Sequence, residues 1–191
     1  MKRTSLLLAL MVFSALPALA ETSEFGVLVG GSRRFVDGAP KEDDVTFEDS
    51  TFALSNNSFD IYWSIPLDPT TFLKFKAGRI QTQVPVGYNV EGSDKLFRRD
   101  EDGDVAHIEA NVEYRFSEAF GSTGLFGGVG FYRQSTPDSD SVNNYGVNAG
   151  VNADFPITRR YGVVVEATYH WTRFDFQPRY LTVAGGLRIA F

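Results

Sequence analysis

Residues 106–116 read AHIEANVEYRF, and this stretch decides the fold. Every second residue, from Ala106 through Ile108 to Phe116, is apolar or aromatic, whereas the residues between them are polar or charged. A period of two places these two sets on opposite faces of a β-strand. A helix would scatter the apolar set around its circumference. The stretch therefore predicts a strand with one apolar and one polar face.

Seven further segments alternate in the same way, so the sequence predicts eight strands. Three of them are as regular as the first: residues 145–155, 163–171 and 181–191. The other four are less clean: residues 25–30, 59–65, 73–78 and 125–132. The chain contains 18 glycines and is 14% aromatic. This composition fits a β-structure in which apolar and polar side chains alternate.

The connections between the predicted strands alternate between short and long. The short ones are residues 66–70, 117–122 and 156–160, all rich in turn-forming residues. The long, polar ones are residues 33–55, 81–104, 135–143 and 172–179. Short turns at one end and long loops at the other are typical of the β-barrels of bacterial outer membranes. With both chain ends on the periplasmic side, the three turns are periplasmic and the four loops lie outside the cell.

A soluble β-barrel is the competing fold, because alternation alone does not say which face is inside. Two features favour the membrane. The polar face holds many Gly, Asn, Ala and Ser residues, which suit a narrow lumen better than a soluble surface. Aromatic residues also gather near the predicted strand ends, as the interfacial girdles of transmembrane barrels require. These are Trp63, Tyr114, Phe116, Phe155, Tyr169, Trp171 and Phe191.

The first twenty residues have the features of a secretory signal peptide. Lys2 and Arg3 are followed by the short apolar run LLLALMVFSA at residues 6–15, and 18–20 (ALA) give the small-x-small cleavage pattern. The run is too short to span a bilayer comfortably. We therefore expect residues 1–20 to be a cleaved signal peptide and residues 21–191 to be one barrel domain.

Charge and cysteine content exclude several classes of function. The net charge of −6 becomes −8 once Lys2 and Arg3 leave with the signal peptide, which makes nucleic acid a poor partner. The chain contains no cysteine, and neither phosphate-cradling glycine loops nor nucleophile elbows occur. We expect no cofactor, no nucleic-acid partner and a monomeric protein.

The end of the chain, GLRIAF at residues 186–191, resembles the C-terminal assembly signal of outer-membrane proteins. Gly186, Ile189 and Phe191 match that signal, whereas Ala184 stands where a polar residue is usual. The mature chain as a whole resembles the small outer-membrane barrel family of the OmpA transmembrane domain, OmpX and the opacity proteins. Residues 146–156 (GVNAGVNADFP) before a short turn are also typical of that family. The resemblance implies an all-β, eight-stranded antiparallel up-and-down transmembrane barrel that the barrel-assembly machinery recognises through its last strand.

The predicted inner face carries many charges. Eight strands leave an interior just wide enough for side chains to fill, and charges buried there must be paired. We therefore predict a lumen charge network, which also has His107 and His170 on its face. Its members are Asp60, Lys74, Lys76, Glu109, Glu113, Arg115, Asp154, Glu166 and Arg188. Its structural interpretation is a polar plug, and its functional alternative is a gated ion path.

Two further patterns are weaker. His170-Trp171-Thr172 is similar to the His-x-Ser of outer-membrane lipid A deacylases, but those enzymes need a downstream Glu, which this chain lacks. Asp100, Asp102 and Asp104 surround Gly103, and such oxygen ligands suit Ca²⁺. Because the spacing departs from the EF-hand pattern, we expect a solvated acidic loop and only a weak metal candidate.

The sequence thus predicts a non-enzymatic barrel of the bacterial outer membrane with a structural or cell-surface role. A small ion or solute channel is the alternative, and a lipid A-modifying enzyme is the third hypothesis. Outer-membrane lipid and lipopolysaccharide are the expected neighbours.

Overall fold

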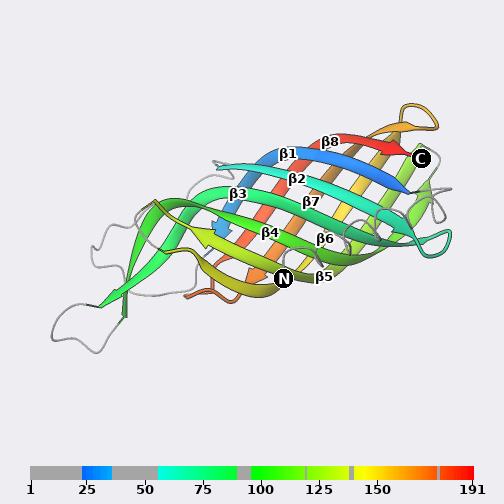
Figure 1. Ribbon diagram of the computed structural model, residues 1–191. Helices are drawn as coiled ribbons and strands as arrows, with labels where there is room; N and C mark the ends of the chain where they lie inside the picture. Colours follow the sequence, from blue (N-terminus) through cyan, green and yellow to red (C-terminus); the bar gives the residue numbers. More distant parts are fainter. Residues whose placement is uncertain (1–22, 36–55, 90–95, 119, 138–139, 176) are drawn as a thin grey trace, which may run out of the picture.

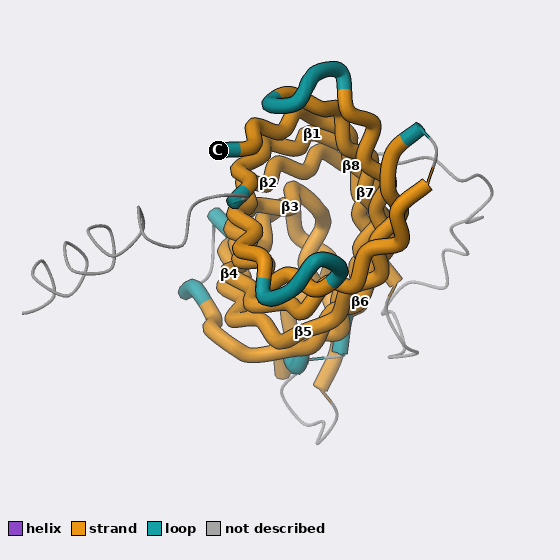
Figure 2. The backbone as a smooth tube through the Cα atoms, turned by 90° about the vertical axis from the view of Figure 1, so that its right-hand side faces the viewer, coloured by secondary structure: helices purple, strands orange, loops and turns teal. Residues whose placement is uncertain are grey.

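The computed structural model describes residues 23–35, 56–89, 96–118, 120–137, 140–175 and 177–191. The proposed signal peptide lies outside these residues. Within them the chain forms eight strands: β1 (Glu24–Phe35), β2 (Asn56–Pro66), β3 (Thr71–Asn89), β4 (Leu96–Glu118), β5 (Gly121–Ser135), β6 (Val142–Pro156), β7 (Tyr161–Thr172) and β8 (Arg179–Ala190). Each strand pairs antiparallel with the next, and β8 pairs with β1 to close the barrel (Figures 1 and 2). The predicted fold is confirmed.

The two faces of the barrel are those that the alternation predicts. On the outer face Val29 is 60% exposed, Ile108 65% and Val129 62%. On the inner face Glu109 and Glu113 are at most 1% exposed. Charges inside and apolar side chains outside are the reverse of a soluble barrel, so that competing fold is wrong. No helix within the described ranges is long and apolar enough to span a membrane.

Aromatic side chains form contacts near both ends of the outer face. At the end with the short turns, the ring centroids of Trp63 and Phe75 are 6.3 Å apart. At the end with the long loops, those of Tyr169 and Trp171 are 4.4 Å apart. Aromatic side chains prefer the interface between acyl chains and water. The two groups therefore mark the two edges of a lipid-facing band.

The β3–β4 hairpin is longer than the sequence predicts. We expected residues 81–104 to form a loop, but β3 continues to Asn89 and β4 begins at Leu96. Their pairing runs without interruption past Gln81 and Asp104, and the hairpin projects beyond the other strands (Figure 1). Beyond the lipid-facing band the alternation reverses: Ile80 and Val105 are buried on the inner face, whereas Gln81 and Asp104 lie on the outer face. The apolar outer face that marks a lipid-facing strand therefore ends although the backbone pairing persists.

Two of the short turns share one hydrogen-bonding pattern. In the β2–β3 turn the Asp68 carboxylate accepts hydrogen bonds from the backbone N–H groups of Thr70 and Thr71, both at 2.8 Å. In the β6–β7 turn the Thr158 hydroxyl accepts from those of Arg160 and Tyr161, at 3.2 and 3.0 Å. The hydrogen bond from Thr70 N–H, with those from its neighbours, holds the pKa of Asp68 below its usual value.

Glycines on the inner face make room for large side chains. A Cβ atom on Gly26 would lie 2.3 Å from the ring of Tyr62, and one on Gly150 would lie 2.3 Å from the ring of Phe126. On the outer face, by contrast, a Cβ on Gly127 would come no closer than 3.5 Å to a neighbour. Inward rings thus lie over glycine backbone, which lets them fill the narrow barrel.

We expect Gly150→Ala to destabilise the barrel by roughly 1–3 kcal/mol, because overpacking displaces either the Phe126 ring or the Ala167 carbonyl, 2.4 Å from the added methyl. Equilibrium urea unfolding of the protein in lipid vesicles measures this. The matched control, Gly127→Ala, should change the free energy of unfolding by less than about 0.5 kcal/mol. Equal effects of the two substitutions would contradict the packing argument.

Candidate functional site

The inner face carries a set of ionisable side chains joined by ion pairs, here called the lumen network. Its members are Glu24, Asp60, Lys74, Lys76, His107, Glu109, Glu113, Arg115, Asp154, Glu166, His170 and Arg188. All except Arg115 are buried, and the Arg115 side chain is only 11% exposed. They project from seven of the eight strands, and Tyr132 adds a contact from β5. The network therefore ties together the whole circumference of the barrel.

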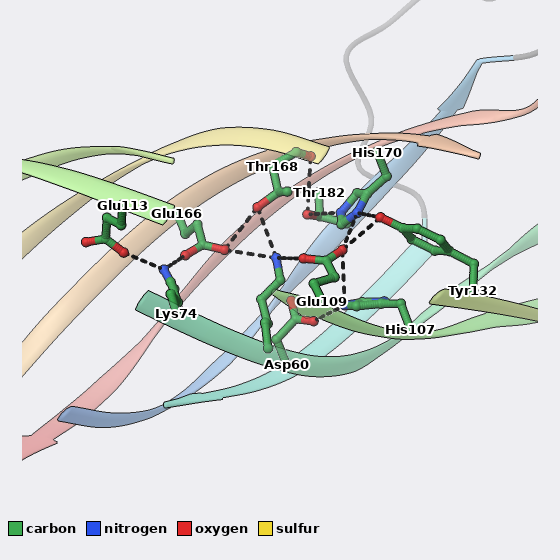
Figure 3. Close-up of polar contacts among 11 residues, drawn as sticks. Asp60, Lys74, His107, Glu109, Glu113, Tyr132, Glu166, Thr168, His170 and Thr182 are labelled. Atoms are coloured by element: carbon green, nitrogen blue, oxygen red, sulfur yellow. Dashed lines mark hydrogen bonds and ion pairs between the residues drawn. The ribbon is translucent and has the colours of Figure 1, made fainter. Parts of the chain in front are cut away.

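Glu166 lies between the two lysines of β3 (Figure 3). Its carboxylate accepts a hydrogen bond from Lys74 and another, of 3.1 Å, from Lys76. Lys74 also lies 3.3 Å from Glu113, and Lys76 lies 3.3 Å from Glu109. Lys74 and Lys76 are neighbours on one face because they are two residues apart on a strand. One short sequence motif, Lys-Phe-Lys, thus supplies the cations for three carboxylates.

Glu109 is the centre of a second group, nearer the end with the long loops. Its Oε1 atom lies 2.8 Å from His170 Nδ1 and accepts a 3.0 Å hydrogen bond from the Tyr132 hydroxyl. His107 Nε2 lies 2.8 Å from Asp60 Oδ1 and 4.0 Å from Glu109 Oε1. The two imidazole rings are 5.3 Å apart (Figure 3). Both histidines are therefore tied to carboxylates inside the lumen.

Glu109, His170 and Thr182 follow the order carboxylate, imidazole, hydroxyl. His170 Nε2 lies 3.3 Å from Thr182 Oγ1, on the side of the ring opposite Glu109. Such an order activates a nucleophile in hydrolases. Here the three side chains are at most 2% exposed. The hydroxyl of Thr182 is therefore buried and is not open to a substrate from solvent.

A third group closes the lumen toward the end with the short turns. Arg115 contacts Glu113 and lies 2.7 Å from Glu24, and Arg188 contacts Asp154 and lies 3.6 Å from Glu24. The Arg115 guanidinium also stacks 3.9 Å from the centroid of the Phe72 ring. Glu24 at the start of β1 is therefore held by strands β4 and β8.

The charges of the lumen network nearly balance. It contains six carboxylates and four Lys or Arg side chains. Uncompensated charge in a low-dielectric interior is costly. The two histidines lie beside Asp60 and Glu109, and Glu109 is also paired with Lys76.

Apolar side chains cover the network at the end with the long loops. This cap consists of Ile80, Val84, Val105, Tyr132, Phe174 and Tyr180, each at most 4% exposed. Phe174 belongs to the β7–β8 loop and folds back into the barrel. The Thr172 hydroxyl holds this loop by donating a 2.6 Å hydrogen bond to the Pro178 carbonyl. Among the described residues of the lumen, buried apolar side chains thus lie toward the long loops and ion pairs lie toward the short turns.

The structure places all nine residues of the predicted lumen charge network on the inner face, where eight of them form ion pairs with one another and Asp60 lies beside His107. The sequence prediction missed Glu24, although its parity with Gly26 and Leu28 on β1 points inward. It also missed Tyr132, which shares the inward parity of Phe126 on β5. Phe174 carried no such signal, since it lies in a loop where no periodicity applies.

The weaker sequence candidates have different outcomes. The segment with Asp100, Asp102 and Asp104 lies in strand β4, so the expectation of an acidic loop was wrong. The Asp100 side chain lies outside the described residues, and Asp104 pairs with Arg79 at 2.6 Å. Within the described ranges, no three His, Cys, Asp or Glu side chains are grouped to hold a metal ion. His170 of the deacylase-like motif faces the lumen and is fully buried.

Comparison with solved structures identifies the fold. The attachment invasion locus protein Ail of Yersinia pestis is 15% identical over 90% of this chain and 99% of its own, with a TM-score of 0.52. The N-terminal β-barrel domain of Pseudomonas aeruginosa OprF is 11% identical over 90% of this chain and 98% of its own, with a TM-score of 0.56. Neisserial surface protein A is 11% identical over 88% of this chain and 97% of its own, with a TM-score of 0.60.

No protein-family model matches the sequence, and no curated protein sequence is significantly similar to it. The structural likeness, at these low identities, establishes the architecture. It agrees with the closed strand order and with the apolar outer face. The protein therefore has the fold of the small eight-stranded outer-membrane β-barrels.

Proposed function

We propose that this protein is a non-enzymatic barrel of the bacterial outer membrane with a structural or cell-surface interaction role. The apolar outer face between two aromatic groups supports residence in a membrane. The fold shared with Ail, OprF and NspA supports the outer membrane as its location. A cleaved signal peptide at residues 1–20 would direct export. The barrel then acts as a rigid base that presents its long loops outside the cell.

One observation carries the proposal: the side chains of the lumen network and of the apolar cap are buried inside the barrel. Glu166, Lys74 and Lys76 occupy its middle and are each at most 3% exposed. A lumen filled in this way supports a plug and disfavours a continuous water path. The alternative, a small ion or solute channel, is favoured by the polarity of the same side chains, which could line a path if they moved apart.

The proposal also assigns no catalytic role to the lumen histidines. His170 contacts Glu109, Tyr132 and Thr182 inside the barrel. A lipid A-modifying site would instead need its reactive groups on the lipid-facing surface. The position of His170 therefore supports a structural role.

The expected partners are outer-membrane lipid, lipopolysaccharide and the barrel-assembly machinery, with the protein itself a monomer. Gly186, Ile189 and Phe191 lie on or beside β8, and the Phe191 N–H donates a 2.9 Å hydrogen bond to the Ser23 carbonyl. Ile189 and Phe191 are on the outer face, exposed by 37% and 66%. Their accessibility supports recognition of this strand from the lipid side.

The plug is tested by conductance. We expect the purified protein to give no reproducible openings in planar bilayers, because its lumen is filled. A variant with Lys74, Glu113 and Glu166 all replaced by serine is the positive control, provided that it folds on an unheated gel. A variant with outward Phe75→Ser controls for general damage to the wall. Stable openings of the wild-type protein would favour the channel.

A structural role for the lumen network also predicts the effect of Glu166→Gln. Removing one member of a buried ion-pair group costs roughly 3–5 kcal/mol, because Lys74 and Lys76 lose a counter-charge. Urea unfolding in vesicles measures the free energy of unfolding. Asp104→Asn, at the exposed pair with Arg79, is the control and should cost less than about 1 kcal/mol. Similar values for the two variants would count against the network as a stabilising element.

Recognition by the assembly machinery predicts that deletion of Phe191 lowers the amount of protein in the outer membrane. The aromatic side chain would be lost, whereas the lumen network and the cap remain. Immunoblotting of outer-membrane fractions, with Phe191→Tyr as the conservative control, measures the yield. Unimpaired yield of the deletion variant would argue against the assembly-signal interpretation.

A further inference from the structure

A cavity of about 330 Å³ opens on the outer face, at the end with the long loops. It is separate from the lumen, because Tyr145, Val147 and Trp171 in its wall all have outward parity and are 60%, 50% and 41% exposed. These residues come from β6 and β7. Gly146 and Thr172 of the same strands also line it, and the β7–β8 loop and the start of β8 add Arg173, Gln177 and Arg179.

The cavity is apolar on one side and cationic on the other. Val147 and Trp171 belong to the lipid-facing surface, whereas Arg173 and Arg179 come from the β7–β8 loop and the first residue of β8. Among the described residues that line it, none is acidic. The cavity therefore spans the level at which an acyl chain would meet a charged headgroup.

Arg173 is held in place by its neighbours. Its Nη1 atom donates a 2.7 Å hydrogen bond to the Tyr145 hydroxyl, and its Cζ atom lies 5.0 Å from the centroid of the Tyr145 ring. The Arg173 carbonyl accepts a 2.5 Å hydrogen bond from the Asn144 side chain. A guanidinium fixed in this way loses less conformational entropy when it binds an anion.

The loop wall of the cavity is also fixed. Gln177, which lines the cavity, has a positive φ of 42°, and its N–H donates a 2.9 Å hydrogen bond to the Phe174 carbonyl. Phe174 is itself buried in the cap inside the barrel. A non-glycine residue in this backbone region persists only where its surroundings enforce it. The cavity is thus part of the folded barrel.

We propose that this cavity binds the phosphate-bearing headgroup of an anionic lipid in the outer leaflet. Guanidinium forks match the geometry of phosphate oxygens. Trp171 and Tyr145 are suited to the interface between chains and headgroups. The lipid-facing wall of Val147 and Trp171 accommodates the start of an acyl chain, which a free phosphate ion lacks. The proposal rests on the proposed membrane location of the barrel.

The two tryptophans of the chain allow a direct test. Trp171 lines the cavity, whereas Trp63 lies near the end with the short turns. In a Trp63→Phe variant, Trp171 is the sole reporter. The protein is reconstituted in phosphatidylcholine vesicles containing 20 mol% phosphatidic acid, with brominated chains on either one lipid or the other. Quenching of Trp171 then gives the preference of the cavity for phosphatidic acid.

We expect a preference of about tenfold, the size of one charge-assisted contact. Arg173→Gln should reduce it to near unity, and Arg173→Lys should restore part of it. Arg79→Gln removes a cation at the same end of the barrel, on β3, and should leave the preference unchanged. With Trp171→Phe, the remaining Trp63 should report no preference.

Several outcomes would overturn the proposal. Equal losses with Arg173→Gln and Arg79→Gln would indicate general surface electrostatics. A preference that survives Arg173→Gln would exclude the cavity as its source. Abolition by 10 mM inorganic phosphate would indicate a soluble anion as the ligand. If brominated phosphatidylcholine quenches neither tryptophan, the barrel is not inserted, and the proposed membrane location fails instead.

Discussion

The structure depends on the need to neutralise charge inside a closed, narrow sheet. Eight strands leave little space inside, and the side chains that fill it here include six carboxylates. Each needs a cation or a proton donor nearby, because a buried charge without a partner is costly. Lys74 and Lys76 meet this need by contacting three carboxylates from two other strands. The sheet is thus joined across its interior as well as along its strands.

Space sets a second constraint on the same interior. The inward rings of Tyr62 and Phe126 fit because Gly26 and Gly150 lie against them, where a Cβ atom would clash. The outer face obeys a different requirement, since lipid accepts apolar side chains of any shape. The cavity beside Tyr145 and Trp171 lies where the tightly packed interior and the lipid-facing surface adjoin. Phe174 contributes to the cap inside, while Arg173, beside it in the chain, faces the cavity outside.

Much of the fold was predictable from the sequence. The alternation in residues 106–116 assigned each side chain to its face, and the turn positions agree with the strand ends observed. The extended β3–β4 hairpin was not predicted, because around Gln81 and Asp104 the outer face becomes polar and the lipid-facing pattern ends. The specific partners of the lumen network also escaped prediction. The alternation along each strand predicts that Lys74 and Glu166 both point inward. It does not predict that β3 and β7 face each other across the barrel, which is what brings the two side chains into contact.

Glu24 has a consequence for how the barrel closes. It lies at the start of β1, the strand that must pair with β8 to complete the ring, and it contacts Arg188 on β8 and Arg115 on β4. In a barrel whose β1–β8 seam is still open, Arg188 lacks this counter-charge, and two strand edges lack hydrogen-bond partners. We therefore expect closure to be cooperative, because the ion pair of Glu24 and the backbone hydrogen bonds between β1 and β8 form in the same step. The contact between Glu24 and Arg188 then disfavours separation of β1 from β8.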